Sequence, residues 1–178
     1  MNELVLPAGT RWLGLSRRKI NALGALACGG MMGFALFAQH VMGLEPCPLC
    51  ILQRVGALGL GLVFLLAALH NAGPAGARIW GIVILLTAGL AGSVSARHVW
   101  LQNLPADQVP ACGPGLDYML DVFGFTEAMS MVFAGSGECA EVVWRLLGLS
   151  MPAWVLICFA TVGIAGFLLN WRLARSAT

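Results

Sequence analysis

The stretch "EPCPLCILQRVGALGLGLVFLLAALH" (residues 45–70) places a Cys-x-x-Cys pair and one arginine at the start of a long apolar segment. Within residues 51–70 the only charged side chain is Arg54. At about 1.5 Å per residue in a helix, this segment is long enough to cross a hydrocarbon core of about 30 Å. The stretch therefore predicts a membrane-spanning helix that carries two thiols at one end.

The composition of the whole chain is that of a membrane protein. Of its 178 residues, 59% are hydrophobic and 10% are charged, whereas soluble domains carry about 45–50% and about 25%. Three further charge-free segments, 20–39, 79–96 and 152–171, are long enough to span. The first is too long for the apolar part of a signal peptide, so we expect it to be retained. A net charge of +2 does not suggest a nucleic-acid partner.

The distribution of basic residues predicts the orientation. Most of the ten lie before the first span, between the second and third, or after the fourth, namely Arg11, Arg17, Arg18, Lys19, Arg78, Arg172 and Arg175. This side should be cytoplasmic and should hold both termini and a tight turn at 70–78. The loops 40–50 and 97–151 then face outward, which in a bacterium is the periplasm. Within the second loop, residues 116–135 predict a short amphipathic helix on the membrane surface. We thus expect an all-α membrane protein: one domain (1–178), a four-helix transmembrane bundle with two periplasmic loops.

Four of the six cysteines, Cys47, Cys50, Cys112 and Cys139, fall in these outer loops. Disulfides persist in the oxidising periplasm, so one interpretation is that these cysteines form two structural disulfides. A zinc site of four thiolates is another, but the oxidising side and the wide spacing of Cys112 and Cys139 argue against it, and we expect no metal. Closing a short Cys-x-x-Cys loop adds little stability, which favours redox chemistry. The remaining two, Cys28 and Cys158, lie within spans and are interpreted as small hydrophobic residues.

Cys50 falls at the first turn of the second span, where the helix dipole favours a thiolate. Arg54 lies one turn deeper on the same face. An arginine near a span end can simply extend to the headgroups, but a charge inside a span commonly marks a function. No haem, iron–sulfur or nucleotide motif is present to accept two electrons from a dithiol. A lipid-soluble quinone fits both the location and the stoichiometry.

The residues "PCPLCILQR" (46–54), the pair Cys112 and Cys139, and "FAGSGECAEVVWRLLGLSMPAW" (133–154) closely resemble DsbB, the quinone-linked disulfide-forming protein family of the bacterial inner membrane. The resemblance covers nearly the whole chain. It implies that Cys112 and Cys139 form a disulfide that oxidises a DsbA-like periplasmic protein of the thioredoxin fold. Cys139 would then exchange with Cys47, and Cys50 would deliver electrons to ubiquinone or menaquinone.

The resemblance also implies a quinone site formed by Arg54, His98 and Met151. A histidine at a span end is otherwise often an interface residue, and a methionine there is often simple core. Gln53 stands where some relatives carry an acid, so we assign it no catalytic duty. Trp100, Trp144 and Trp154 are interpreted as interfacial anchors. Two rival interpretations remain: a reductase of the vitamin-K-epoxide type, and a non-enzymatic membrane scaffold with two structural disulfides.

Overall fold

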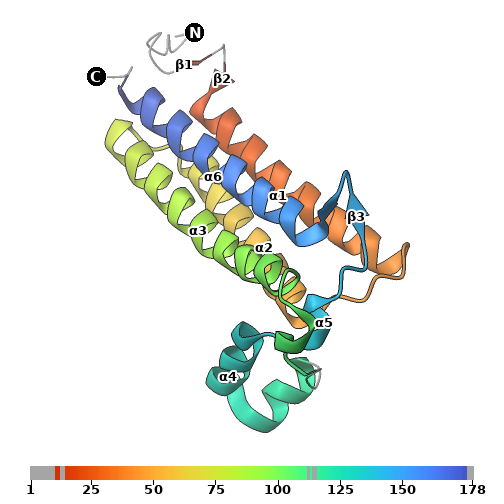
Figure 1. The fold of residues 1–178 in the computed structure, drawn as a ribbon. Coiled ribbons are helices and arrows are strands. Elements are labelled where there is room, and N and C mark those ends of the chain that lie inside the picture. Colours follow the sequence, from red (N-terminus) through yellow and green to blue (C-terminus); the bar gives the residue numbers. More distant parts are fainter. Residues whose placement is uncertain (1–10, 13–14, 112, 114–115, 176–178) are drawn as a thin grey trace, which may run out of the picture.

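Four long helices form the body of the protein in the computed structural model, which describes residues 11–12, 15–111, 113 and 116–175 (Figure 1). They are α1 (Arg17–His40), α2 (Pro48–His70), α3 (Pro74–Leu101) and α6 (Met151–Arg175). Each contains a stretch long and apolar enough to cross a membrane. The predicted all-α four-helix membrane bundle is confirmed.

The helices begin earlier than the apolar segments because capping residues and prolines, rather than hydrophobicity, determine a helix start. Ser16 caps α1 by accepting a hydrogen bond of 3.4 Å from the Lys19 N–H. Pro74 occupies the first turn of α3, where its missing N–H costs nothing. The turn before it therefore covers only residues 71–73 instead of the predicted 70–78. Arg78 lies inside α3, and its placement in a loop was wrong.

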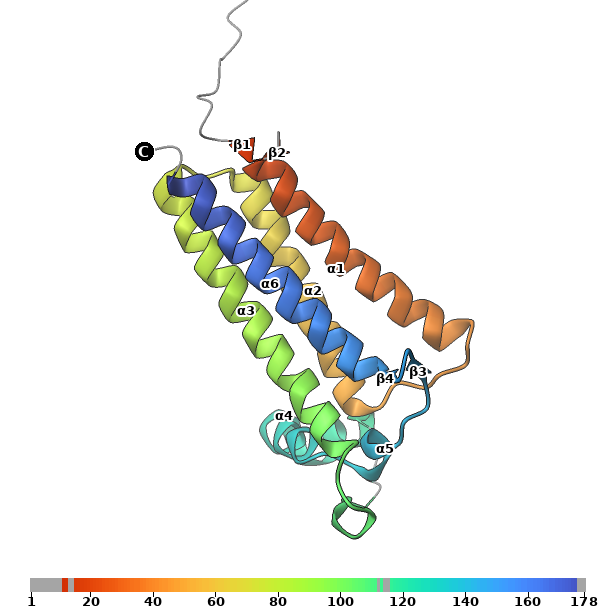
Figure 2. The ribbon, with the colours of Figure 1, turned by 45° about the horizontal axis from the view of Figure 1, so that its top comes forward.

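The core of the bundle is filled by large side chains from three helices. Leu60 and Phe64 of α2, Ile84 of α3 and Phe159 of α6 are almost completely buried together. The most extensive contacts join α3 to α6 and α1 to α2 (Figure 2). Gly56 lets α2 approach α3 closely, since an added Cβ would lie 2.8 Å from the Cβ of Ala91.

Leucines on the outer faces of the bundle expose much of their surface, among them Leu26 (70%), Leu58 (58%) and Leu90 (73%). A soluble protein seldom exposes so many large apolar side chains. This outer surface fits a lipid environment.

The second long loop places its helical segments at the end of the bundle where α3 finishes (Figure 1). It contains a 3-10 turn (Ala106–Gln108), α4 (Leu116–Ala134) and α5 (Gly137–Ala140). The predicted amphipathic helix at 116–135 is helical but consists of two pieces, because Gly124 adopts φ 73° and ψ 169°. Met119 and Val132 of α4 pack against Leu49 and Leu101 of the bundle. Its position on a membrane surface stays a prediction.

Two short hairpins were not predicted. One pairs β1 (Arg11–Trp12) with β2 (Leu15–Ser16), and the other pairs β3 (Arg145–Leu146) with β4 (Leu149–Ser150) just before α6. The second turns at Leu147 and Gly148, which both have positive φ values (52° and 82°), as a two-residue hairpin loop requires. Strands of two residues are too short to show an alternating pattern in the sequence.

Candidate functional site

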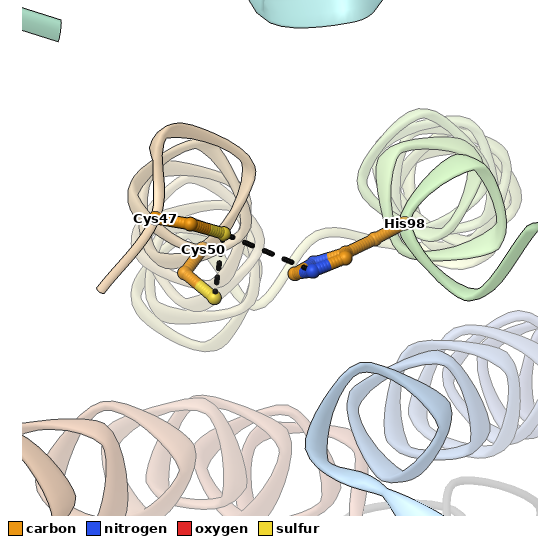
Figure 3. A group of neighbouring side chains, drawn as sticks. All are labelled: Cys47, Cys50 and His98. Carbon is orange, nitrogen blue, oxygen red and sulfur yellow. Dashed lines mark hydrogen bonds between the residues drawn. The ribbon is translucent and has the colours of Figure 1, made fainter. Parts of the chain in front are cut away.

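The Cys-x-x-Cys pair meets a histidine from another helix at the loop end of the bundle (Figure 3). Cys47 is the N-cap of α2 and Cys50 lies in its first turn, so their Sγ atoms are 3.3 Å apart. His98, near the end of α3, points its Nε2 at Cys47 Sγ at 3.8 Å. Residues 51 positions apart are thus brought into one cluster of free thiols and an imidazole.

His98 is buried and its imidazole contacts the side chain of Gln53, a residue with no predicted catalytic role. Only 2% of His98 is exposed, and its Nδ1 lies 2.9 Å from the Gln53 side-chain amide. Gln53 is itself buried, and a buried amide and a buried imidazole each need a polar partner. His98 is therefore part of the protein interior rather than a residue wetted at the interface. The sequence offered one signal for this contact: Gln53 is a polar amide within an apolar span, one turn after Cys50.

Arg54 connects α2 to α1 instead of extending away from the bundle. Its guanidinium donates one hydrogen bond to the side-chain oxygen of Gln39 and another, of 3.1 Å, to the main-chain oxygen of Ala35. A guanidinium has five N–H donors. Arg54 is thus fixed in place while retaining donors for a further acceptor.

One cavity brings most of the predicted site residues together. Its wall includes Cys47, Cys50, Arg54, His98 and Met151. The rest of the lining is largely apolar, with contributions from α1 and the start of α6. It also contains Trp144, so this side chain has a place in the cavity wall besides its predicted role as an interfacial anchor. Three carboxylates complete the lining: Glu45, Glu138 and Glu141. The sequence did not indicate this part of the site.

Cys139 lies in α5, close to the first cysteine pair. It is buried and packs in the same cluster as Leu49, with Cys47 against that cluster. Its Sγ lies 3.7 Å from the Ser136 hydroxyl. A hydrogen bond with the Cys47 thiol, together with burial, holds the pKa of the Cys139 thiol above its ordinary value. Predicted partner Cys112 lies outside the described residues.

The chain next to Cys112 is described and contacts the neighbourhood of Cys139. The Gly137 N–H donates a hydrogen bond of 3.3 Å to the Ala111 carbonyl. A Cβ added to Gly113 would lie in van der Waals contact with Ser136, at 3.7 Å. Both flanks of position 112 therefore contact the segment that carries Cys139.

Arg97 fixes the end of α4 from which the Cys139 segment continues. Its Nε and NH2 groups donate hydrogen bonds of 3.1 and 3.0 Å to the carbonyls of Phe133 and Ala134. The last carbonyls of a helix lack partners within it, and a cation is favourable there. The guanidinium also lies over the Trp100 ring, 4.1 Å from its centroid.

We expect Arg97→Met to loosen the segment 133–140. Losing this cap should lower the free energy of local unfolding of the segment by about 1 kcal/mol, so its amides should exchange about fivefold faster. Hydrogen exchange followed by mass spectrometry measures this directly. The exposed Arg145→Met, in β3, is the matched control. Unchanged exchange at 133–140 in Arg97→Met would show that the cap does not order the segment.

The raised pKa of Cys139 leads to a pH prediction. A thiol with a raised pKa stays protonated at neutral pH, and only the thiolate attacks a disulfide. In a Cys112→Ser variant prepared with its Cys47–Cys50 disulfide intact, attack of Cys139 on Cys47 forms a Cys47–Cys139 disulfide and releases Cys50. This exchange should therefore accelerate from pH 6 to pH 8, by up to about tenfold per pH unit. Acid quenching and alkylation at timed intervals give the rate. A rate that is flat or falls with pH would contradict the prediction.

The fold and this cluster define a multi-pass, all-α membrane protein with a dithiol pair at one end of its bundle. The family model described as Disulfide bond formation protein DsbB matches residues 17–169. Disulfide bond formation protein B of Chromobacterium violaceum is 53% identical over 150 residues, covering 84% of this chain and 90% of the relative. The corresponding protein of Marinobacter nauticus is 48% identical over 158 residues, covering 89% and 94%.

The chain therefore belongs to the DsbB family, as the resemblance in its sequence indicated. Membership identifies it as an oxidoreductase of disulfide bond formation that is embedded in a membrane.

Proposed function

We propose that the protein is a thiol–quinone oxidoreductase of the bacterial inner membrane, which reoxidises a DsbA-like protein in the periplasm. The observation that carries this proposal is the shared cavity: Cys50 and the fixed guanidinium of Arg54 line the same space at one end of a membrane bundle. The loops at this end would face the periplasm, as the distribution of basic residues predicts.

The cavity has the chemistry that a quinone headgroup needs. Quinone oxygens accept hydrogen bonds, and Arg54 keeps N–H donors beyond those given to Gln39 and Ala35. The apolar part of the lining, which includes Met151, suits a flat ring. When bound, a quinone accepts two electrons and two protons. Whether it is ubiquinone or menaquinone, the residues named here would bind it in the same way.

The two cysteine pairs would act in sequence. A thiolate of the reduced partner attacks Cys112, breaks its bond to Cys139, and leaves as part of the partner's own disulfide. Freed Cys139 attacks Cys47 and releases Cys50 as a thiolate. Cys112 would next attack Cys139, which re-forms their disulfide and frees Cys47 as a thiolate. Cys47 and Cys50 would then re-form their own disulfide as the electron pair passes to the acceptor held in the cavity. The sum is one dithiol oxidised and one quinone reduced, with two protons transferred.

The position of Cys139 supports the middle step. It packs beside Cys47, so exchange between the pairs requires no large movement of α5. The same contact would let Cys47 rather than Cys50 receive the attack. Cys50, on the cavity wall with Arg54, is then the leaving thiolate. His98 faces Cys47 and is placed to exchange a proton with that thiol; its predicted contact with the quinone also remains part of the proposal.

Quinone absorbance tests this function. Purified protein containing quinone is mixed with reduced DsbA, and one quinol should form for each DsbA disulfide. The matched control is the Cys28→Ser/Cys158→Ser variant, because these two cysteines lie within the spans and outside the proposed route; it should turn over normally. A scaffold stapled by structural disulfides would leave the quinone unchanged, and that result would reject the proposal.

A further inference from the structure

We propose that the reduced protein binds one Zn²⁺ ion through Cys47 Sγ, Cys50 Sγ and His98 Nε2, with water in the fourth position. These three atoms all lie within 4.8 Å of one another. They come from the start of α2 and the end of α3, and Figure 3 shows the three side chains converging on one point. Two thiolates and an imidazole are ligands that zinc prefers. This site has two thiolates and one imidazole and excludes Cys139, so it differs from a zinc site of the four loop thiolates.

The distances between the ligand atoms are close to those of a tetrahedral zinc site. With Zn–S near 2.3 Å and Zn–N near 2.05 Å, tetrahedral angles separate two sulfurs by about 3.8 Å and a sulfur from a nitrogen by about 3.6 Å. The observed separations are 3.3 Å between the sulfurs and 3.8 Å from Cys47 Sγ to His98 Nε2. The third separation, between Cys50 Sγ and the His98 nitrogen, is within 4.8 Å. Movements of up to about 1 Å, within reach of side-chain rotation, would complete the geometry.

The surroundings of His98 resemble those of a zinc-ligating histidine. Such a histidine nearly always has its second ring nitrogen bonded to a protein group that orients the ring. Gln53 lies 2.9 Å from His98 Nδ1 and does this here. Binding at Nε2 leaves the proton on Nδ1, which then donates to the amide oxygen of Gln53; a half-turn of the amide presents that oxygen at the same contact.

The cavity next to the cluster also favours a cation that carries water. Glu45, Glu138 and Glu141 line it, against the single positive charge of Arg54. The side-chain oxygen of Gln102, in the same lining, is buried and has no hydrogen-bond partner among the described residues. A water molecule bound to zinc can donate a hydrogen bond to this oxygen.

Zinc binding would hold the pair in its reduced form. One Zn²⁺ replaces the protons of the two thiols, which leave as two H⁺, and no sulfur is oxidised or reduced. Formation of the Cys47–Cys50 disulfide then requires the ion to depart. The inference concerns binding to the reduced chain and holds independently of which electron acceptor the protein uses.

Cobalt substitution tests the site without any measurement of turnover. The reduced full-length protein is titrated with Co²⁺ in the absence of oxygen, and Zn²⁺ is then added. We expect thiolate-to-cobalt absorption and the visible bands of tetrahedral cobalt at one ion per chain, displaced by Zn²⁺. The Cys112→Ser/Cys139→Ser variant should give the same spectrum and stoichiometry. If its spectrum is lost, the ligands come from both cysteine pairs and the proposal is wrong.

Variants of the histidines and of Gln53 complete the test. We expect Gln53→Leu to weaken Co²⁺ binding by about 10–100-fold, the loss that is typical when a partner that orients a ligand is removed. His98→Ala removes a ligand itself and should weaken Co²⁺ binding more. His40→Ala, an exposed histidine at the end of α1, is the matched control and should bind normally. Equal affinity in His98→Ala and His40→Ala, or no thiolate-to-cobalt band in the unaltered protein, would overturn the proposal.

Discussion

The Cys50→Ser variant, reconstituted with quinone and given reduced DsbA, is expected to form quinol at least about 10³-fold more slowly than the unaltered protein. Cys50 lines the cavity with Arg54, and serine has neither the acidity nor the nucleophilicity of a thiol. One round of exchange upstream of it should survive: reduced DsbA takes up the Cys112–Cys139 disulfide and leaves oxidised. The variant has no Cys47–Cys50 disulfide to restore that pair, so it should stop with Cys47, Cys112 and Cys139 as thiols, which alkylation and mass spectrometry count.

Cys158→Ser serves as the control for this variant, since Cys158 is also half-buried but lies in the middle of α6. It should reduce quinone at the normal rate. Continued turnover of Cys50→Ser would show that electrons leave the protein from another group.

The second large effect is expected for Arg54→Met. A hydrogen bond from a charged donor is worth about 1.5–3 kcal/mol, so losing it should raise KM for quinone by about 10–100-fold. Exchange with DsbA should change much less, because Arg54 bonds to Gln39 and Ala35 in α1 and makes no hydrogen bond with either cysteine. Steady-state rates with the quinone and DsbA concentrations varied separately give the two values.

Arg54→Lys tests whether charge alone is sufficient. Lysine keeps the positive charge but lacks the planar, forked guanidinium that can bond two acceptors and a ligand at once. The KM of Arg54→Lys for quinone should therefore fall between those of the unaltered protein and Arg54→Met. Thermal unfolding of both variants reports the loss of the α1–α2 contact separately. Equal damage to quinone reduction and to DsbA exchange would contradict the assignment of Arg54 to the quinone.

Local rules of sequence were sufficient for the bundle and for the first half of the site. Long apolar segments, three without a charge and one with Arg54 alone, predicted the four membrane helices. The Cys-x-x-Cys pair before the second segment placed both thiols at its start. Helical spacing placed Arg54 on the same helix face as Cys50, and both side chains line the cavity. Helix ends were less predictable, because Pro74 extends α3 backward through Arg78 although its first turns are not strongly apolar.

The other half of the site depends on contacts between distant parts of the chain. Gln53 and His98 are 45 positions apart, and Arg97 reaches Phe133 across 36 positions. Periodicity describes one element at a time, so it indicates neither which helices become neighbours nor which polar groups meet between them. The carboxylates on the cavity wall were not predicted for the same reason, since Glu138 and Glu141 come from the second loop and Glu45 comes from the first.

A single-turnover reaction of the isolated pair is the most direct test of the electron route. The Cys112→Ser/Cys139→Ser variant is reduced, freed of reductant and mixed with one equivalent of quinone in the absence of oxygen and of any partner protein. Quinol formation is followed by absorbance, and the thiols at positions 47 and 50 are counted by alkylation. The account predicts one quinol per chain and a Cys47–Cys50 disulfide in equal amount. Unchanged quinone with both thiols still open to alkylation would contradict it.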